Sequence, residues 1–181
     1  MSLIYSPRED SYLLSKTLKE QIPKLLKKNP NIKILELGSG SGIQLQSLKE
    51  LGIKSSNILG TDLNKEAIKF CKNLGFKCIY SDLFSNVKSK FDIILFNPPY
   101  LPEDNLEDKE SKIATTGGKN GSELINKFLK QAKDYLNKNG RIFLLTSSLT
   151  KKINWRNWKK KKVSEQKLFF EKIFVWELQS N

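Results

Sequence analysis

Two kinds of hydrophobic pattern follow one another along the chain. Short apolar runs predict buried strands, and stretches with apolar residues three or four positions apart predict amphipathic helices. The runs predict strands at 32–38, 57–63, 77–83, 91–97 and 141–147, and the helical spacing predicts helices at 9–28, 41–52, 64–75 and 121–138. Strands that alternate with helices form a parallel sheet covered on both faces, so we expect an α/β fold.

The two ends of the chain depart from this alternation. Pro23 lies within the first helical stretch and predicts either two short helices or one kinked helix, because proline lacks the N–H that a helix interior needs. Near the C-terminus, the pattern predicts a lysine-rich helix at about 151–162, followed by strand-like segments over 167–178. A chain of 181 residues is long enough for one core, and we expect a single domain over 1–181.

Composition narrows the chemistry. The chain has no histidine, which excludes Ser-His-Asp catalysis, Cys-His catalysis and the common zinc sites, so no metal site is expected. Its two cysteines, Cys71 and Cys78, are interpreted as core thiols. No apolar run approaches the roughly 20 residues that cross a bilayer, and the charged N-terminal stretch predicts no signal peptide, so we expect a cytoplasmic or nuclear protein. The net charge of +13 fits either a nucleic-acid partner or simply a lysine-rich proteome.

A glycine-rich loop lies between the first predicted buried strand and the helix after it. The sequence "ELGSGSG" over 36–42 places Gly38, Gly40 and Gly42 where the backbone must turn sharply and approach a ligand closely. It does not fit the nicotinamide or flavin spacing G-x-G-x-x-G/A, because Ile43 or Leu45 stands at the last position. The loop therefore predicts a different nucleoside ligand.

Acidic residues lie beside this loop and at the ends of the next two strands. Glu36 directly precedes the glycines, where a pyrophosphate would be repelled but a cation accepted. Asp62 ends the second strand and is placed to accept ribose hydroxyls, and Asp82 ends the third, where it is expected to accept from the adenine amine. A ribose, an adenine, a positive charge and no phosphate describe S-adenosylmethionine as the cofactor.

The fourth strand ends in "NPPY" at the edge of the sheet where such folds bind ligands. Pro98 and Pro99 fix the backbone and donate no hydrogen bond, but their carbonyls accept, and Asn97 adds a side-chain oxygen. Two rigid acceptors side by side suit a planar NH₂ group, which they would aim at a sulfonium methyl, while Tyr100 stacks on the substrate. Positioning and electrostatics then supply the catalysis without a strong base. A proline-rich turn after a core strand is the alternative interpretation.

Taken together, these motifs resemble the class I, Rossmann-like methyltransferases of the HemK/PrmC type. The chain is similar, more narrowly, to the eukaryotic and archaeal enzymes that methylate the glutamine of the GGQ motif in class I translation termination factors. The resemblance follows the chain in order through "YSPREDSYLL" (5–14), "ELGSGSG" (36–42), "GTDLN" (60–64), "SDLF" (81–84), "FNPPY" (96–100), "GGKNG" (117–121) and "LFFEKIFVWEL" (168–178). It implies one seven-stranded, mostly parallel sheet flanked by helices.

The resemblance also implies roles for individual residues. Asn97 matches the residue that orients the substrate amide, and Asn120 stands in "GGKNG" where the family usually has aspartate. Cofactor-contacting positions of the family match Tyr5, Asp10, Ser11, Glu36, Gly38, Asp62, Leu63, Asp82 and Leu83.

Partners follow from the same resemblance. Family members of this group act on a class I termination factor and pair with a small zinc-binding activator subunit, which we expect to add a strand at the sheet edge near Lys77 to Asp82. An RNA or DNA exocyclic-amine methyltransferase is the main alternative, since "NWRNWKKKK" interleaves Trp155 and Trp158 with lysines. A non-catalytic binding subunit and histone-lysine methylation are further alternatives. No membrane partner is expected.

Overall fold

Seven strands form one sheet in the computed structural model, which describes residues 4–103 and 115–181. Their order is β3-β2-β1-β4-β5-β7-β6, and β7 alone runs in the direction opposite to the other strands. The strands are β1 (Ile34–Leu37), β2 (Ile58–Asp62), β3 (Lys77–Tyr80), β4 (Phe91–Phe96), β5 (Leu136–Ser147), β6 (Trp158–Lys167) and β7 (Lys172–Ser180). The expected seven-stranded, mostly parallel sheet is confirmed, and so is the position of β3 at its edge.

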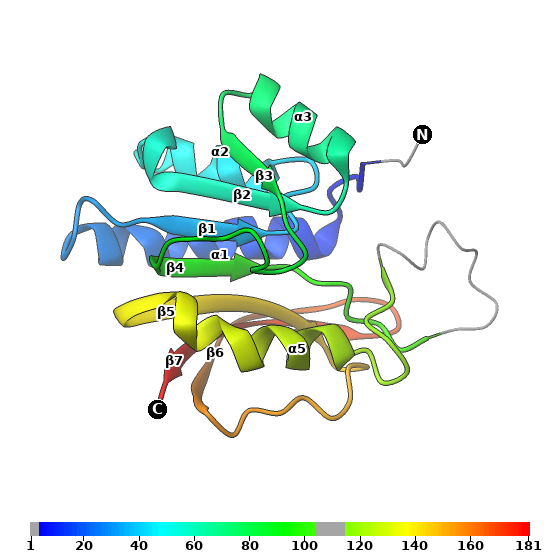
Figure 1. The fold of residues 1–181 in the computed structure, drawn as a ribbon. Coiled ribbons are helices and arrows are strands. Elements are labelled where there is room, and N and C mark those ends of the chain that lie inside the picture. Colours follow the sequence, from blue (N-terminus) through cyan, green and yellow to red (C-terminus); the bar gives the residue numbers. More distant parts are fainter. Residues whose placement is uncertain (1–3, 104–114) are drawn as a thin grey trace.

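Helices cover both faces of the sheet, as Figure 1 shows with α5 in front of the strands and α1 behind them. The described helices are α1 (Glu9–Leu26), α2 (Ile43–Glu50), α3 (Lys65–Asn73) and α5 (Glu123–Ala132), with short 3₁₀ turns at Ser55–Asn57 and Lys133–Tyr135. One apolar cluster joins α1, α2 and α3 to the sheet, and a second joins α5 to the opposite face. The core therefore has two halves separated by the strands.

Alternation along the central strands decides which side chains reach which half. On β1, Ile34 belongs to the cluster under α1 and Leu35 to the cluster under α5, and on β4 the same holds for Ile93 and Ile94. Because the side-chain period of a strand is two, Glu36 points to the same side as Ile34. The sheet thus sends this acidic side chain toward α1 and α2.

The carboxyl ends of β1, β2 and β4 meet at one edge of the sheet. The register pairs Leu37 with Thr61 of β2 and with Phe96 of β4, so the residues that follow these strands are neighbours. Ligands of open parallel sheets bind beyond the carboxyl ends of the strands. The order of elements therefore gathers the predicted site residues at this edge.

Of the two alternatives expected at Pro23, two separate short helices are wrong, because α1 is one helix. Pro23 lies near its C-terminal end, where its missing N–H removes a single bond, and its carbonyl still accepts from the amide of Lys27 at 3.2 Å. The helix expected over 121–138 was too long: α5 ends at Ala132, and β5 begins at Leu136. Asn139, with φ of 65°, turns the backbone within this strand rather than ending a helix.

The lysine-rich helix expected at 151–162 is wrong. Its second half belongs to β6, which pairs with β7 over its whole length. Trp158 is buried at the start of β6, while Lys160 lies over the rings of Trp155 and Trp176, with its nitrogen 4.8 and 5.0 Å from the two ring centres. The tryptophans pack on the protein, and strand pairing, not helical packing, places them.

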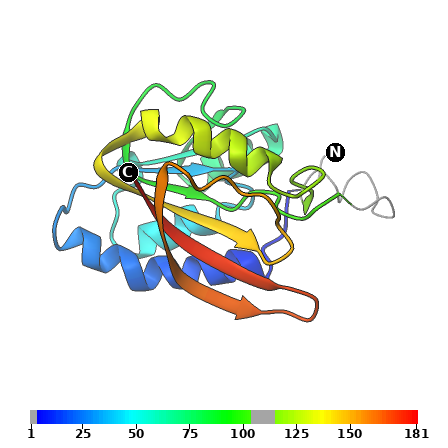
Figure 2. The ribbon, with the colours of Figure 1, turned by 90° about the horizontal axis from the view of Figure 1, so that it is seen from below.

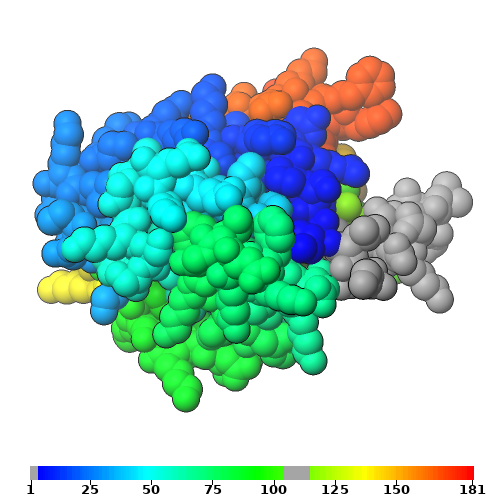
Figure 3. Space-filling view, turned by 90° about the horizontal axis from the view of Figure 1, so that it is seen from above, coloured from blue at the N-terminus to red at the C-terminus, as the bar shows by residue number. Residues whose placement is uncertain are grey.

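Strands β6 and β7 form a long hairpin that turns at the same end of the molecule as the start of α1 (Figure 2). In the space-filling view from above, this turn projects from the body of the protein (Figure 3).

Among the described residues, no helix is long and apolar enough to cross a membrane, and no cluster of three potential metal ligands occurs.

Candidate active site

A cavity opens at the carboxyl ends of β1, β2 and β4, and most of the predicted site residues line it. The predicted site residues that line the cavity are Tyr5, Asp10, Ser11, Glu36, Gly38, Gly40, Asp62, Asn97, Pro98, Pro99 and Tyr100. Sequence reasoning missed the other lining residues, which are Ser39, Ser41, Ile43, Gln44, Leu101 and Thr115. The N-terminal segment, the glycine loop and the NPPY corner therefore enclose one site.

The glycine loop turns through left-handed backbone conformations that favour glycine. Gly38, Gly40 and Gly42 have φ values of 67°, 48° and 73°. Asp62, the last residue of β2, accepts from the amide of Gly40 and from the amide of Asn64, both at 2.8 Å. Asp62 thus holds the loop in place, and a carboxylate has further lone pairs with which to accept hydroxyl groups of a ligand.

Glu36 lies at the floor of the cavity and is 4% exposed. Its Oε2 atom has no hydrogen-bond partner among the described residues. Burial, assisted by the nearby Cys78 and Asp62, raises the pKa of Glu36 well above its usual 4.5. Because an unpartnered buried carboxyl is unfavourable, this group is suited to a ligand that brings a hydrogen-bond donor or a positive charge.

A polar seam fixes the start of α1 against α2. Gln44 donates to the carbonyl of Ser11 at 2.8 Å, and its oxygen accepts from the hydroxyl of Ser15, also at 2.8 Å. All three side chains are buried. This seam holds the N-terminal segment over the glycine loop, and it explains why Gln44 lines the cavity.

The side chain of Asn97 projects into the cavity directly after β4. Its nitrogen donates to Oδ2 of Asp10 at 3.0 Å, and the phenol of Tyr5 donates to the same carboxylate at 3.2 Å. Since a carboxylate only accepts hydrogen bonds, it must face the NH₂ end of Asn97. The oxygen of Asn97 is buried without a partner among the described residues. An acceptor without a partner among them is thereby left beside the cavity.

Backbone contacts hold the NPPY corner against the loop at 117–121. The amide of Leu101 donates to the carbonyl of Thr115 at 2.9 Å, and the amide of Gly117 donates back to Leu101 at 2.9 Å. A Cβ on Gly117 would lie 2.5 Å from the carbonyl oxygen of Pro99, so no larger residue fits there without movement. The loop thus supports the corner from behind. The sequence between the fourth predicted strand and the next helix predicts a long loop from Pro98 to about Gly118, of which 104–114 lie outside the described residues.

Asn120, which stands where the family resemblance expects an aspartate, lies in the loop just before α5. Its backbone and side-chain nitrogens both donate to the carboxylate of Glu123, at 3.1 and 2.7 Å. The hydrogen bond from the Asn120 side chain is the main reason that the pKa of Glu123 is lowered. Asn120 therefore orders the loop and makes no contribution to the cavity lining.

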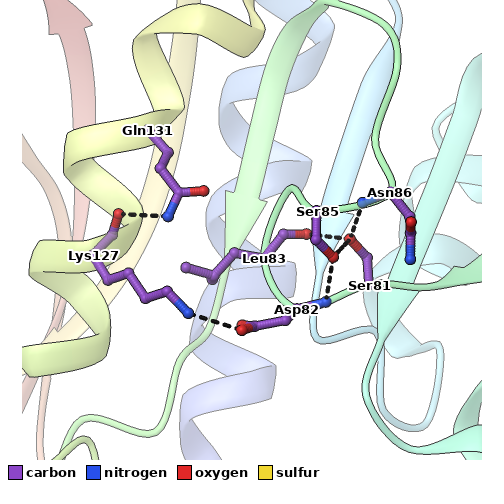
Figure 4. A network of polar contacts seen from close by, with 7 residues as sticks. All are labelled: Ser81, Asp82, Leu83, Ser85, Asn86, Lys127 and Gln131. Atoms are coloured by element: carbon purple, nitrogen blue, oxygen red, sulfur yellow. Dashed lines mark hydrogen bonds and ion pairs between the residues drawn. The ribbon is translucent and has the colours of Figure 1, made fainter.

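Four predicted cofactor residues do not line the cavity: Gly42, Leu63, Asp82 and Leu83. Figure 4 shows Asp82 pointing to Lys127 of α5, with 2.8 Å between the carboxylate and the ammonium nitrogen. Leu63 is more than half exposed, and the carbonyl of Leu83 accepts from Ser81. The adenine contact assigned to Asp82 stays a prediction.

The two cysteines are buried free thiols, as expected for core residues. Cys71 lies 3.7 Å from the carbonyl oxygen of Gly40, and Cys78 lies 4.0 Å from the hydroxyl of Ser39. They pack behind the glycine loop and do not line the cavity.

Comparison with known proteins gives consistent matches. The model of the methyltransferase small domain family matches residues 11–155. A candidate protein N5-glutamine methyltransferase of Methanocaldococcus jannaschii is 40% identical over 155 residues, which cover 81% of this chain and 74% of the relative. The eRF1 methyltransferase catalytic subunit mtq2 of Schizosaccharomyces pombe is 29% identical over 172 residues, covering 82% of this chain and 74% of the relative.

Solved structures share the fold. The Mtq2–Trm112 complex of E. cuniculi, described as responsible for methylation of the eRF1 termination factor, matches with a TM-score of 0.74 and 23% identity over all of both chains. The 16S rRNA N2 G1207 methyltransferase RsmC of T. thermophilus, in complex with AdoMet and guanosine, matches with a TM-score of 0.64 and 16% identity, covering 97% of this chain and 44% of that one.

Proposed function

This chain belongs to the methyltransferase small domain family, and from that premise we propose that it methylates the side-chain amide nitrogen of the glutamine in the GGQ motif of a class I translation termination factor. The methyl donor is S-adenosylmethionine. Two sequence relatives that cover most of the chain carry names of this activity, one for protein N5-glutamine and one for eRF1.

The observation that carries the proposal is the unpartnered oxygen of Asn97. A glutamine amide is a planar NH₂ group with two hydrogens to donate. The Asn97 oxygen can accept one, and a backbone carbonyl of the rigid Pro98–Pro99 pair can accept the other. An amide held by both hydrogens has its nitrogen fixed in position and orientation, which lowers the entropy lost in the reaction.

Asp10 and Tyr5 support this role from behind Asn97. Asp10 occupies the NH₂ end of Asn97, so the side chain cannot turn its nitrogen toward the substrate. Tyr5 in turn holds Asp10, and burial next to that carboxylate raises the pKa of Tyr5, so its phenol stays a donor at neutral pH. Both residues were assigned to the cofactor from sequence, and their contacts favour positioning of Asn97.

The cavity residues also fit S-adenosylmethionine. The glycine loop with Gly38 and Gly40 would accept the nucleoside at close range, Asp62 would accept the ribose hydroxyls, and the partnerless Oε2 of Glu36 suits the positively charged amino-acid part. Bound there, the cofactor would supply an electrophilic methyl group to the amide nitrogen, with S-adenosylhomocysteine as the leaving group and one amide proton released to water. The absence of histidine fits a reaction that depends on positioning.

We propose further that a small zinc-binding activator subunit adds a strand to β3. This strand is the sheet edge beside β2, and Tyr80 on it and Phe70 on the adjacent α3 are 49% and 43% exposed. An edge strand next to exposed aromatic groups is suited to β-augmentation. Expression alone and together with the activator tests this: equal solubility and activity in both cases would contradict it.

The test of the function uses labelled S-adenosylmethionine with the termination factor, in its natural form and with the target glutamine replaced by alanine. Label on the natural factor alone supports the proposal. Transfer to RNA and not to the factor would favour the amine-methyltransferase alternative. In the structure, Lys160 already covers Trp155 and Trp176, which leaves these rings poorly placed to stack bases.

A further inference from the structure

The turn between β6 and β7 presents two bare aromatic side chains. Phe169 is 92% exposed and Phe170 is 85% exposed, more than any other large hydrophobic residue that the structure describes. Their rings pack edge to face, with 4.6 Å between the centres. Two adjacent phenylalanines in solvent form an apolar surface whose burial against a partner would be strongly favourable.

The turn is held in a defined position. The amide of Leu168 donates to the carbonyl of Glu171 at 2.8 Å, which closes the turn, and Leu168 packs against the core. Ser148 and Lys172 exchange two hydrogen bonds, at 2.7 and 2.9 Å, between the end of β5 and the start of β7. The aromatic pair therefore extends from an ordered base, so little entropy is lost when a partner covers it.

The same base is connected to the NPPY corner. The hydroxyl of Ser147 donates to the carboxylate of Glu171, and the amide of Ser147 donates to the hydroxyl of Thr150 at 3.1 Å. The hydroxyl of Thr150 donates in turn to the carbonyl of Tyr100 at 2.8 Å. Besides burial and Asp10, the negative charge of Glu171 contributes to the raised pKa of Tyr100. The turn thus lies beside the mouth of the cavity.

We propose that Phe169 and Phe170 are the docking element through which the enzyme binds the folded surface of its protein substrate next to the target glutamine. This inference rests on the proposed function, because a glutamine held at Asn97 brings the surrounding surface of its protein to the rim of the cavity. Aromatic residues in a polar surround are typical centres of binding energy in protein interfaces.

The charges around the pair define the partner further. Lys167 and Lys172 are exposed on either side of the turn, while Glu171 is occupied by Ser147. The complementary surface is therefore an apolar depression with acidic side chains at its margin. A folded termination factor can present such a surface, whereas a short peptide that contains only the glutamine motif cannot reach the turn and the corner at once.

The experiment compares two substrates with one variant. Phe169→Ala/Phe170→Ala, prepared together with any subunit that the wild type needs, is assayed with the folded termination factor and with a short peptide carrying the glutamine motif. We expect kcat/KM for the factor to fall about 10- to 100-fold, mainly through KM. Turnover of the peptide stays within about 2-fold, which also shows that the variant is folded.

A matched variant and a direct measurement complete the test. Phe169→Leu/Phe170→Leu keeps an apolar surface and is expected to retain most of the affinity. The Kd for binding of the factor, measured by fluorescence anisotropy, should rise from the wild type through the leucine variant to the alanine variant. This measurement does not depend on turnover. The inference would be overturned by an unchanged kcat/KM and Kd for the factor, or by equal losses of kcat/KM on both substrates. It would also be overturned if the variant lost only binding to single-stranded RNA or to anionic vesicles. A wild type inactive on both substrates would instead overturn the proposed function.

Discussion

The side-chain nitrogen of Asn97 lies 3.0 Å from the carboxylate of Asp10, although the two residues are 87 positions apart. This contact fixes which end of the Asn97 amide faces the cavity. Without it, the side chain could present either its oxygen or its nitrogen, and only the oxygen can hold a substrate NH₂ group. A residue on the first helix thereby sets the chemical polarity of the substrate site.

Asp10→Asn tests this relationship. The new amide can accept or donate, so Asn97 no longer has one preferred orientation, and we expect kcat to fall about 10- to 100-fold. The Kd of S-adenosylmethionine should change little in comparison. Glu9→Gln, a change of the neighbouring exposed acid, is the control and should leave kcat near the wild-type value. An unchanged kcat for Asp10→Asn would argue against the positioning role.

Asn97→Ala removes the acceptor itself. Loss of one preorganised hydrogen bond in a water-excluded site typically lowers kcat about 10²- to 10³-fold, and we expect at least this effect. Binding of S-adenosylmethionine, measured by calorimetry, should remain nearly unchanged. Asn73→Ala on the exposed side of α3 serves as the matched control. A variant that kept most of its activity would exclude the amide-holding mechanism.

Asp62→Ala should have the opposite profile. Its carboxylate anchors the glycine loop through the amides of Gly40 and Asn64 and is assigned to the ribose hydroxyls. Removal leaves these donors without their acceptor, so we expect the Kd of S-adenosylmethionine to rise about 10- to 100-fold. At saturating cofactor, kcat should be recovered in large part. Undiminished cofactor affinity would count against this assignment.

Glu36→Gln is expected to separate stability from function. The pKa of Glu36 in the folded protein is raised above its unfolded value near 4.5, so its favourable contribution is complete below that pH and is lost as the pH rises. Glutamine does not titrate, so the stability of the variant has no such dependence on pH at this position. Its free energy of unfolding, relative to that of the wild type, should therefore increase between pH 4.5 and pH 8 in urea titrations.

The same variant should bind S-adenosylmethionine less tightly, by about 10-fold or more, since a positively charged ligand would draw Glu36 into its ionised form and glutamine cannot ionise. Both measurements are made without the reaction itself. A stability difference that is independent of pH, or that decreases as the pH rises, would show that Glu36 is not held in its neutral form in the free protein.

Much of the site could be predicted because short local patterns specify it. Glu36, Asp62 and Asn97 each lie at or near the end of a strand, and a parallel sheet brings such ends together whatever the details of packing. The glycines of the loop are equally local, because the turn itself requires them. These features needed only the order of strands and helices.

Contacts between distant segments could not be predicted in this way. Nothing near Asp10 indicates that it faces Asn97, and Gln44 could not be assigned to the cavity without knowing that α2 packs on α1. The prediction of a helix at the lysine run was wrong for a related reason. "WKKKKVSEQK" has no apolar period of its own, so pairing with β7, including a bulge between Lys162 and Ser164, decides its conformation.

That lysine run also makes the two borders of the sheet unequal. Lys159, Lys160, Lys161 and Lys162 and the bulge occupy the outer border at β6, and consecutive positive charges and irregular backbone both hinder alignment with another chain. The edge at β3 has neither consecutive lysines nor a bulge. Addition of a further strand is therefore hindered at β6 and favoured at β3.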